Sequence, residues 1–595
     1  MCAIFSAMAE NFAHVRDRCT GRASTPQAAI GKTARVSLAT AVLRRAMRLP
    51  APRSPRVSVD RDVAVPMPDG TVLRHDHHRP AGVGRGPVVV VRSPYGRAGW
   101  IGTVFGRLVA ERGFQVVVQS VRGTAGSGGV LSPFDEADDG AAFVEWVLDQ
   151  PWCDGRLATL GPSYLGLTQW ALAPAAGKAL RVMGTLVTAS SFRDQTYAGG
   201  SFSLDNALSW SSMMRTMAAG PVARTVRLLH GRRNVTAALD TLPLSSADRR
   251  ATGGEVGWFQ EWLRESDPES AYWTHRAYTD GVEDVARAGV EVTMLGGFHD
   301  IFLPWQLADH AALRAAGARP RLVLGPWVHT AGPGMAAGMR EALAAFERVL
   351  DGSAATAAAT TDETPVAVTL SGGGGTRRLA DWPPPDAVER TWYLRADHSL
   401  SVQPPPDRTA GAVHWPGTRV DYDPADPTPA VGGPILTGRS GPRDQGELEA
   451  RPDVAVFTSD PLTEDVVALG PASATVHLRA EGEHLDVFVR VCDVDPRGRS
   501  VNVTDGLVRL APGAPATAAD GSRAVDLELW PVGHRFAAGH RLRLQVSGGA
   551  HPRFARNPGT GDALGEATTL VPQPREVLHD AAHPTAVRLA VESRR

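Results

Sequence analysis

Long hydrophobic runs are absent from this chain of 595 residues. No apolar stretch approaches the roughly 20 residues that a helix needs to cross a bilayer. The N-terminal stretch MCAIFSAMAENFAHVRDR turns polar and charged too early for the apolar region of a signal peptide. We therefore expect a protein that has no membrane span.

Cysteine is also scarce, and neither sign of charge is in excess. The four cysteines show no spacing typical of a disulfide framework or a metal site: Cys2, Cys19, Cys153 and Cys492. Such cysteine usage fits a reducing compartment, so we expect a cytoplasmic location. The formal net charge is −1 and no long basic stripe occurs, which argues against nucleic acid or an anionic membrane as the main partner.

The first part of the chain, residues 1–56, shows little pattern of a packed domain. The segment KTARVSLATAVLRRAMRL (32–49) is basic and has a helical repeat of apolar residues, which is compatible with a helix on a membrane surface. The interpretation that we favour is a poorly ordered or helical extension, solvated or loosely docked outside the folded unit. The sequence leaves open whether the first fifty residues are a genuine part of the protein.

From residue 57 onward, apolar runs alternate with helical patterns. The chain is too long for one hydrophobic core, so several domains are expected. Val- and Leu-rich runs separated by amphipathic segments predict a parallel sheet with helices on both faces. We assign this α/β core to residues 57–191 and 286–355, and it begins with a hairpin around Asp69 and Gly70.

Two further regions depart from this pattern. Residues 192–285 carry Trp- and Met-bearing helical segments, and we interpret them as a helical cap that acts as a lid, with a purely structural appendage as the alternative. After the small-residue linker SAATAAATTDET, residues 365–595 contain many short strands with Gly, Pro and Asp turns. This pattern predicts a β-sandwich of the jelly-roll type.

A cluster of histidines, His75, His77 and His78 around Asp76, raises the question of a metal site. In a strand, neighbouring side chains point to opposite faces, so only His75 and His77 share one side. We favour a half-exposed strand over metal ligation, and we expect no metal.

Three residue types needed for nucleophilic catalysis follow predicted strands of the core. Ser163 follows the strand 155–160, Asp300 follows 291–297, and His329 follows 321–324. Ligands of open α/β sheets bind beyond the carboxyl ends of the strands. The order Ser, Asp, His is that of α/β-hydrolases. Serine needs a base to become a nucleophile, histidine titrates in the right range, and an acid fixes the imidazole.

Each of these residues also has a simpler interpretation. Ser163 would serve as a helix N-cap, Asp300 would cap the helix that follows it, and His329 would be an ordinary loop histidine. His299, next to Asp300, is a rival base. The glycines around Ser163 favour the nucleophile, although Gly166 comes one residue later than in the common G-x-S-x-G pattern.

The motifs GPSYLG, GGFHDIF and GPWVHT make the chain similar to the cocaine esterase-like (CocE/NonD) hydrolases, relatives of X-prolyl dipeptidyl aminopeptidases and α-amino acid ester hydrolases. The similarity extends from about residue 57 to the C-terminus. It implies an α/β-hydrolase core with an inserted helical cap and a C-terminal jelly roll. It also implies Ser163, Asp300 and His329 as the triad, and an oxyanion hole from the Tyr95 hydroxyl and the Tyr164 backbone N–H. We add Phe302 and Tyr197 as candidate aromatics of an acyl pocket.

The function that we expect is cofactor-independent cleavage of a carboxylic ester, or of an amide, through an acyl-enzyme intermediate. An X-prolyl dipeptidyl aminopeptidase and an acylase or transacylase are alternatives, and a non-catalytic jelly-roll binding protein is an alternative of another class. The expected partner is a small-molecule ester or amide. A homo-oligomer is compatible with the sequence, which does not reveal the oligomeric state or the physiological substrate.

Overall fold

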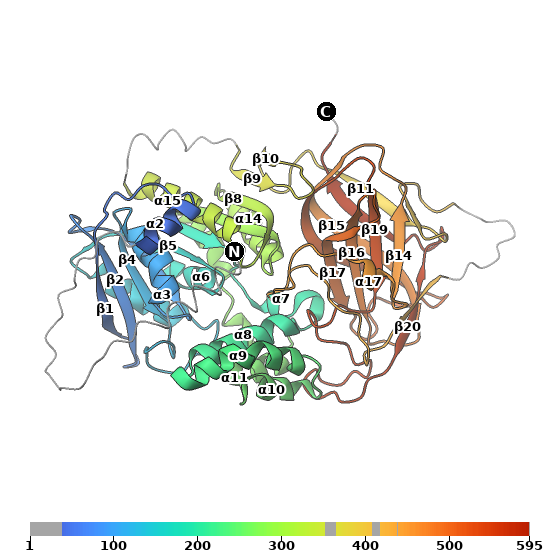
Figure 1. The fold of residues 1–595 in the computed structure, drawn as a ribbon, viewed down its shortest axis with the longest axis horizontal. Coiled ribbons are helices and arrows are strands. Elements are labelled where there is room, and N and C mark those ends of the chain that lie inside the picture. The colour runs from blue at the N-terminus through green and yellow to red at the C-terminus, as the bar shows by residue number, and fades with distance from the viewer. Residues whose placement is uncertain (1–37, 352–363, 407–416, 437, 594–595) are drawn as a thin grey trace.

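The computed structural model describes residues 38–351, 364–406, 417–436 and 438–593. Figure 1 shows a sheet layered between helices at the N-terminal side of the molecule, a group of helices beneath it and a β-rich domain beside both. Among the described residues, no helix is both long enough and apolar enough to cross a membrane.

The first sheet has ten strands in the order β1-β2-β4-β3-β5-β6-β7-β8-β9-β10. All neighbours from β4 to β9 pair in parallel, whereas β1, β2 and β10 pair in antiparallel fashion. The strands are β1 (Val57–Pro66), β2 (Val72–Pro80), β3 (Gly86–Ser93), β4 (Gln115–Ser120), β5 (Cys153–Pro162), β6 (Leu180–Leu186), β7 (Glu291–His299), β8 (Arg321–Val328), β9 (Val366–Thr369) and β10 (Thr376–Leu379).

The side chains of each central strand alternate between the two faces of this sheet and pack into a hydrophobic core on each face. In β3, Val88 and Val90 belong to one buried cluster, and Val89 and Val91 belong to another. Successive side chains of a strand point to opposite faces, so a run of four valines needs helices on both sides. The first face carries α5 (Ala137–Leu148), α6 (Tyr164–Ala176), α13 (Asp280–Arg287) and α14 (Leu303–Ala315). The second carries α3 (Gly99–Ile101), η2 (Gly102–Arg107), α4 (Leu108–Ala110) and α15 (Gly332–Leu350).

A helical insertion, defined here as residues 193–274, lies between β6 and β7. Its aromatic side chains, which include Phe202, Phe259 and Trp273, form a core together with residues of the α/β domain such as Tyr164 and Phe302. The later helix α13 packs on α6 and α14 instead, although the predicted cap extended over it. The helices of the insertion are α7 (Arg193–Thr196), η4 (Ala198–Gly200), α8 (Leu204–Met217), α9 (Pro221–Ala238), η5 (Leu244–Ser246), α10 (Ala247–Thr252), α11 (Gly257–Arg264) and α12 (Ala271–Thr274).

The β-rich domain consists of residues 388–593 as far as they are described, with mostly antiparallel strands. In its long strand β15, buried Ala474, Val476 and Leu478 alternate with partly exposed residues, as expected where one face packs on a core. Its elements are β11 (Val388–Leu394), β12 (Ser399–Ser401), β13 (Thr418–Tyr422), α17 (Gly446–Glu449), β14 (Val454–Ser459), β15 (Val466–Ala480), β16 (Asp486–Val494), β17 (Ser500–Arg509), β18 (Ser522–Phe536), β19 (Arg541–Ser547), β20 (Gln573–Leu578) and β21 (Ala586–Val591).

The α/β-hydrolase core and the C-terminal β-rich domain agree with the predicted fold class, but one strand is placed differently. Residues from 365 onward were expected in the β-sandwich, yet β9 pairs with β8 in the first sheet, with Leu322 opposite Val366. The reason is burial: Val366 and Val368 join the core of the first sheet, and β9 covers a strand that would otherwise form the sheet edge.

The N-terminal extension is helical where it is described, which was one of the two expected alternatives, but it is packed firmly on the core rather than solvated or loosely docked. Residues 38–46 form a helix, α2, whose Thr40 is fully buried and donates a hydrogen bond to Glu111 at 2.9 Å. Arg44 forms an ion pair with the same carboxylate, and Met47 packs into the hydrophobic cluster over α15. This part is docked on the α/β core because it satisfies the buried Glu111, and residues 1–37 lie outside the described residues.

The histidine cluster of β2 is buried, so the prediction of a half-exposed strand is wrong. The reason is that β2 lies between β1 and β4 and is covered on both faces. His75 contacts Trp146, His77 contacts Trp152, and the ring of His78 fills the space beside Gly106 in η2. Burial lowers the pKa of His75 to about 3 and that of His77 to about 4. The described residues contain no group of three or more potential ligands arranged to hold a metal.

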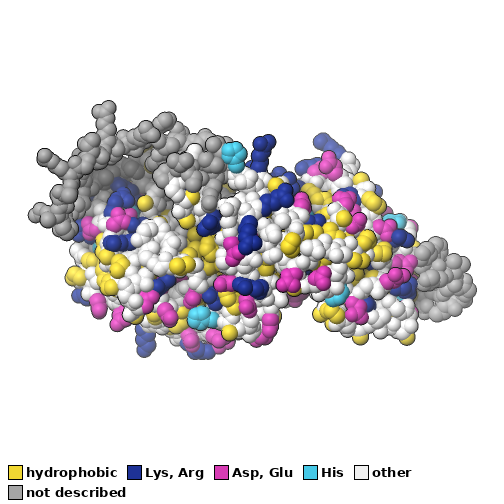
Figure 2. All heavy atoms as spheres, turned by 90° about the horizontal axis from the view of Figure 1, so that it is seen from below, with side chains coloured by type: hydrophobic (Ala, Val, Ile, Leu, Met, Phe, Trp, Pro, Cys, Tyr) yellow, Lys and Arg dark blue, Asp and Glu magenta, His cyan; other side chains and the backbone are white. Residues whose placement is uncertain are grey.

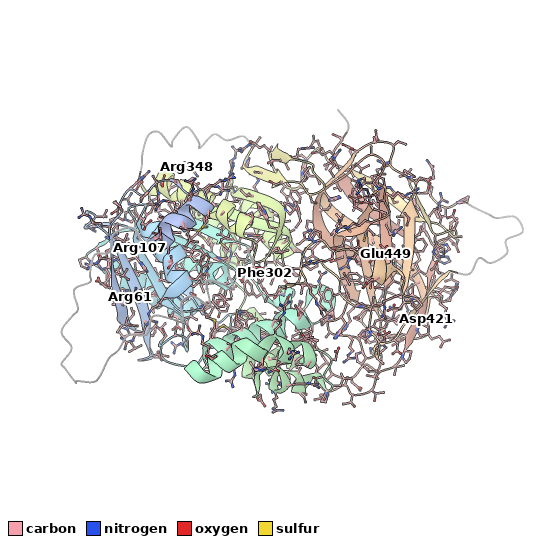
Figure 3. The ribbon with its side chains drawn as sticks, in the orientation of Figure 1. Arg61, Arg107, Phe302, Arg348, Asp421 and Glu449 are labelled. Carbon is pink, nitrogen blue, oxygen red and sulfur yellow. The ribbon has the colours of Figure 1, made fainter. Side chains whose placement is uncertain are left out.

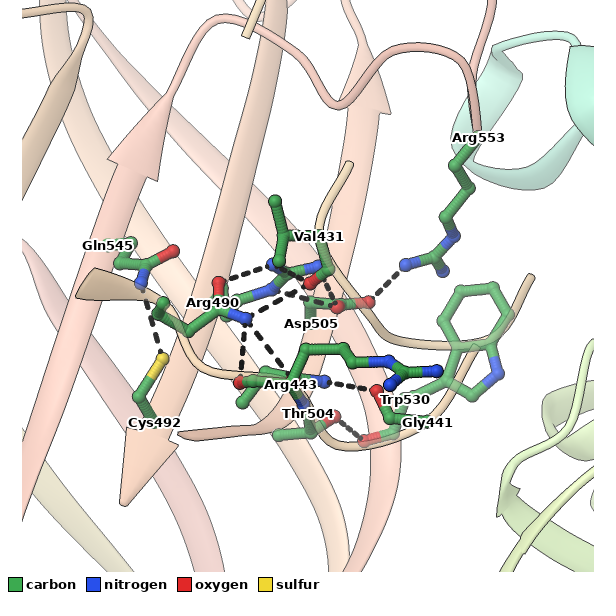
Figure 4. A network of polar contacts seen from close by, with 12 residues as sticks. Val431, Gly441, Arg443, Arg490, Cys492, Thr504, Asp505, Trp530, Gln545 and Arg553 are labelled. Atoms are coloured by element: carbon green, nitrogen blue, oxygen red, sulfur yellow. Dashed lines mark hydrogen bonds and ion pairs between the residues drawn. The ribbon is translucent and has the colours of Figure 1, made fainter. Parts of the chain in front are cut away.

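A buried charge network lies where the β-rich domain faces the α/β core (Figure 4). The Arg490 guanidinium donates to Asp505 at 2.9 and 3.1 Å and to the Val431 carbonyl at 2.7 Å. Arg553 binds the other oxygen of the same carboxylate and stacks over Trp530. Burial raises the pKa of Asp505, but the guanidiniums of Arg553 and Arg490 outweigh it, so the pKa lies below its ordinary value.

We expect Asp505→Asn to destabilise the protein by about 3–5 kcal/mol, because it leaves two buried guanidiniums without their carboxylate. Denaturant-induced unfolding measures this change. Asp421→Asn is the matched control, because Asp421 pairs with Arg419 on the surface, where a pair contributes about 0–1 kcal/mol. Equal effects of the two substitutions would contradict the role of the network.

Candidate active site

Ser163 lies in a sharp turn between strand β5 and helix α6. Its backbone has φ 56° and ψ −127°, a conformation that residues other than glycine rarely adopt and that costs about 1–3 kcal/mol. Such a strained strand-to-helix turn is typical of a nucleophile elbow, because it lifts the serine hydroxyl above the sheet. The N-cap interpretation does not hold, since Ser163 makes no side-chain capping hydrogen bond.

The glycines around Ser163 are explained by close contacts. A Cβ at Gly161 would lie 2.4 Å from the Leu165 side chain, and one at Gly166 would lie 2.2 Å from Thr188 Cγ2. The Thr188 hydroxyl in turn donates to the Ser163 carbonyl at 2.8 Å. Gly166, which comes one residue later than in the common pattern, is therefore the position at which Thr188 packs against the first turn of α6.

The structure brings Ser163, His329 and Asp300 together in one chain of hydrogen bonds. In the tautomer that carries the proton on Nδ1, His329 donates to Asp300 Oδ2 at 2.7 Å, and its Nε2 accepts from Ser163 Oγ at 3.0 Å. Asp300 is fully buried, and the His329 side chain is 9% exposed. These distances satisfy the geometry of a nucleophile, a base and an orienting acid.

Asp300 is held by groups from two domains. Its Oδ1 accepts the backbone N–H of Phe302 at 2.8 Å. Phe302 rather than Asp300 is the N-cap residue of α14, and no side chain caps this helix, so the capping interpretation of Asp300 does not hold. Its main-chain carbonyl accepts the indole N–H of Trp530, from β18, at 3.1 Å. The β-rich domain thus contacts the acid directly, although Trp530 was not among the predicted site residues.

His299 does not take part in this arrangement. Burial lowers the pKa of its imidazole to about 4, and the charged groups that act on it all come from the β-rich domain: Asp505, His534, Arg490 and Arg553. His329 makes the hydrogen bond to Ser163 instead. The rival assignment of the base to His299 is therefore not supported by the geometry.

The two predicted oxyanion donors flank Ser163. The Tyr95 hydroxyl interacts with Ser163 and accepts the indole N–H of Trp210, from α8, at 3.1 Å. Burial of this hydroxyl raises its pKa above the ordinary value, so it keeps its proton at neutral pH and remains a donor. Helix α6 begins at Tyr164, and the first N–H groups of a helix have no partner within it.

The side chain of Tyr164 anchors the start of α6 in a buried polar chain. Its hydroxyl donates to Glu136 at 2.8 Å and accepts the backbone N–H of Phe134 at 2.9 Å. Glu136 forms an ion pair with Arg92 at 3.0 Å. Burial raises the pKa of Glu136 in spite of Arg92. Sequence reasoning missed Glu136 and Trp210, because nothing in their local pattern indicates contact with the two tyrosines.

Ser163 and His329 open into a cavity of about 690 Å³. Phe302 lines it and contacts His329, with ring centres 5.5 Å apart, and Figure 3 shows Phe302 near the middle of the molecule. Further walls come from the helical insertion and, through Leu436, from the β-rich domain, whose Leu436 N–H donates to Asn206 of α8 at 3.0 Å. Aromatic side chains dominate the interior, including Phe134, Phe192, Trp210 and Trp262.

Tyr197 does not line this cavity, in contrast to the expectation. Its hydroxyl donates to the Trp262 carbonyl, and its ring packs against Phe202 and Trp273 within the insertion. The preceding residues Gln195 and Thr196 reach the cavity instead. The reason is that Tyr197 follows the short helix α7 and turns toward the core of the insertion.

Comparison with known proteins gives two adjoining family matches. The model of X-Pro dipeptidyl-peptidase (S15 family) matches residues 69–331, and that of the X-Pro dipeptidyl-peptidase C-terminal non-catalytic domain matches residues 358–588. Cocaine esterase of Rhodococcus sp. (strain MB1 Bresler) is 28% identical over 547 residues, which cover 85% of this chain and 93% of that protein.

Two solved structures share the fold over almost the whole chain. An aminopeptidase from a marine sediment archaeon, Thaumarchaeota archaeon, has a TM-score of 0.74 at 20% identity and covers 98% of this chain and 100% of its own. An α-amino acid ester hydrolase has a TM-score of 0.74 at 22% identity, with 91% of this chain and 98% of its own covered.

We expect Gly166→Ala to lower the stability by about 1–3 kcal/mol, because the added methyl group overpacks the contact with Thr188. Thermal or denaturant-induced unfolding measures the loss. Gly257→Ala is the control, since a Cβ at Gly257 in α11 meets no atom within 4 Å. If Gly166→Ala were as stable as the control, Thr188 would not constrain the turn.

Proposed function

The chain belongs to the X-Pro dipeptidyl-peptidase (S15) family, among its cocaine esterase-like CocE/NonD hydrolases, and is a serine hydrolase of esters or amides; within it, we propose that Ser163, His329 and Asp300 form the catalytic triad. The observation that carries this proposal is the hydrogen-bonded chain from Asp300 through His329 to the strained Ser163. His329 Nε2 is positioned to take the hydroxyl proton as Ser163 Oγ attacks the carbonyl carbon.

In the acylation step, the bond between Ser163 Oγ and the carbonyl carbon forms and the bond to the leaving group breaks. The proton taken by His329 passes to the leaving oxygen or nitrogen, and an acyl-enzyme remains. Asp300 fixes the tautomer of the neutral His329 imidazole and stabilises the imidazolium that forms when it takes the proton. Water then gives a proton to His329 as it attacks the acyl carbon. The bond between the acyl carbon and Ser163 Oγ breaks, His329 returns the proton to this oxygen, and the acid is released.

We assign the oxyanion hole to the Tyr95 hydroxyl and the Tyr164 backbone N–H. One such donor is worth about 2.7–4 kcal/mol where it has been removed by mutation. Since the Trp210 N–H occupies an acceptor site of the Tyr95 oxygen, the hydroxyl proton is directed elsewhere. Trp210 and Trp530 thus act as positioning residues, one for an oxyanion donor and one for the acid.

An ester is favoured over a peptide with a free amino terminus. Recognition of an ammonium group calls for a carboxylate in the cavity, and no Asp or Glu lines the Ser163 cavity among the described residues. The aromatic walls favour an apolar acyl group instead. The helical insertion covers this cavity with Trp210 and Trp262, which supports its proposed role as a lid.

The proposed partner is a small-molecule ester, and the proposed location is the cytoplasm. Cys153 and Cys492 are both free and buried, which is compatible with a reducing compartment. Cys2 and Cys19 lie outside the described residues.

We expect Ser163→Ala and His329→Asn each to lower kcat for a p-nitrophenyl ester by about 10³-fold or more, since members of a triad act as a unit. His299→Asn is the matched control, because His299 is a buried histidine at the end of β7, next to Asp300, that does not contact Ser163. It should retain kcat within about tenfold. Steady-state kinetics on variants with unchanged circular dichroism provides the test.

Two outcomes would contradict the assignment. The first is full turnover by a folded Ser163→Ala protein. The second is a loss of activity in His299→Asn that equals the loss in His329→Asn.

A further inference from the structure

A second cavity, of about 420 Å³, adjoins the cavity that contains Ser163. The two cavities share Met213, Met217 and Arg224 as lining residues, so they adjoin at these side chains. The second cavity lies between α8 and α9 of the helical insertion, and Ala430, Ile435 and Arg439 of the β-rich domain also line it. Nothing in the mechanism above uses it.

Three guanidinium groups give this second cavity a positive charge. Arg224 and Arg232 come from α9 and Arg439 comes from the β-rich domain, whereas Asp205 is the one acidic residue of the described lining. In the described part of the chain, none of the three arginines forms an ion pair. Figure 2 looks onto the helical insertion and shows several basic side chains across the middle of that face, with acidic side chains among them.

The distribution of charge differs between the two cavities. The Ser163 cavity is mostly apolar, with no Asp or Glu and only one Arg among its described lining residues. That residue is Arg224, which also lines the second cavity. A molecule that extends from Ser163 across Met213 and Met217 therefore passes from aromatic walls into a group of arginines.

We propose that the substrate is an ester with an apolar segment next to the scissile bond and a carboxylate at its remote end, bound by Arg224, Arg232 and Arg439. This inference rests on the proposed function of Ser163. Guanidinium groups bind carboxylates through paired N–H donors, and unpaired arginines have this capacity available. All three guanidinium groups line the same cavity, two from α9 and one from the β-rich domain.

The test compares esters that differ only in a remote charge. In one series, p-nitrophenyl monoesters of linear dicarboxylic acids are measured against the same compounds methylated at the distal carboxyl. In a second series, the carboxylate is carried by the alcohol part of a hexanoyl ester. A preference in the first series places the acyl chain toward the arginines, and a preference in the second places the leaving group there.

We expect kcat/KM of the anionic ester to exceed that of its neutral partner by about tenfold at low salt, as for charge-assisted hydrogen bonds at a partly exposed site. The ratio should fall as ionic strength rises. In Arg224→Gln it should drop to about threefold or less, and in the triple Gln variant of the three arginines to about one.

Arg233→Gln is the control, because Arg233 is an exposed residue of the same helix that does not line the cavity; it should leave the ratio and the turnover of neutral esters unchanged. A ratio near one in both wild-type series, or a ratio that the triple variant retains, would overturn the inference. Neutral esters that are still hydrolysed with dependence on Ser163 would then show that the proposed function stands while the substrate class is wrong. A wild-type protein that hydrolyses no ester would point to failure of the function itself.

Discussion

The strained backbone of Ser163 is the constraint on which the rest of the site depends. A positive φ at a serine persists only where the surroundings enforce it, and here β5, α6 and Thr188 do so. Helix α6 begins at Tyr164, directly after this turn. The turn therefore positions both the Ser163 hydroxyl and the Tyr164 backbone N–H. His329, at the end of β8, donates to Asp300, at the end of β7, and accepts from the Ser163 hydroxyl.

The site is assembled from three parts of the molecule rather than from the sheet alone. The helical insertion provides Trp210, which orients the Tyr95 hydroxyl, and the β-rich domain provides Trp530, which holds the carbonyl of Asp300. The buried pair of Arg490 and Asp505 lies behind Trp530 at the same interface. A domain described as non-catalytic in the family therefore contacts the main chain of Asp300 directly, and its strand β18 also packs against β7 and α14.

Sequence reasoning located the residues whose position follows from chain direction. Ser163, Asp300, His329 and Tyr95 each follow a parallel strand, and the carboxyl ends of such strands meet at one edge of the sheet. Contacts between distant segments could not be predicted in this way: Trp530 lies 230 residues from Asp300. The pairing of β9 with β8, the burial of His75 and the inward turn of Tyr197 are likewise decided by packing, which a local pattern does not encode.

The central claim is that Ser163 carries the acyl group during turnover. Rapid acid quenching during hydrolysis of a slowly deacylated ester, followed by peptide mass spectrometry, measures this directly. The account predicts an acyl adduct on the peptide that contains Ser163, formed and lost at rates that match turnover. An adduct on another residue, or continued turnover without any adduct on Ser163 under conditions in which deacylation limits the rate, would contradict it.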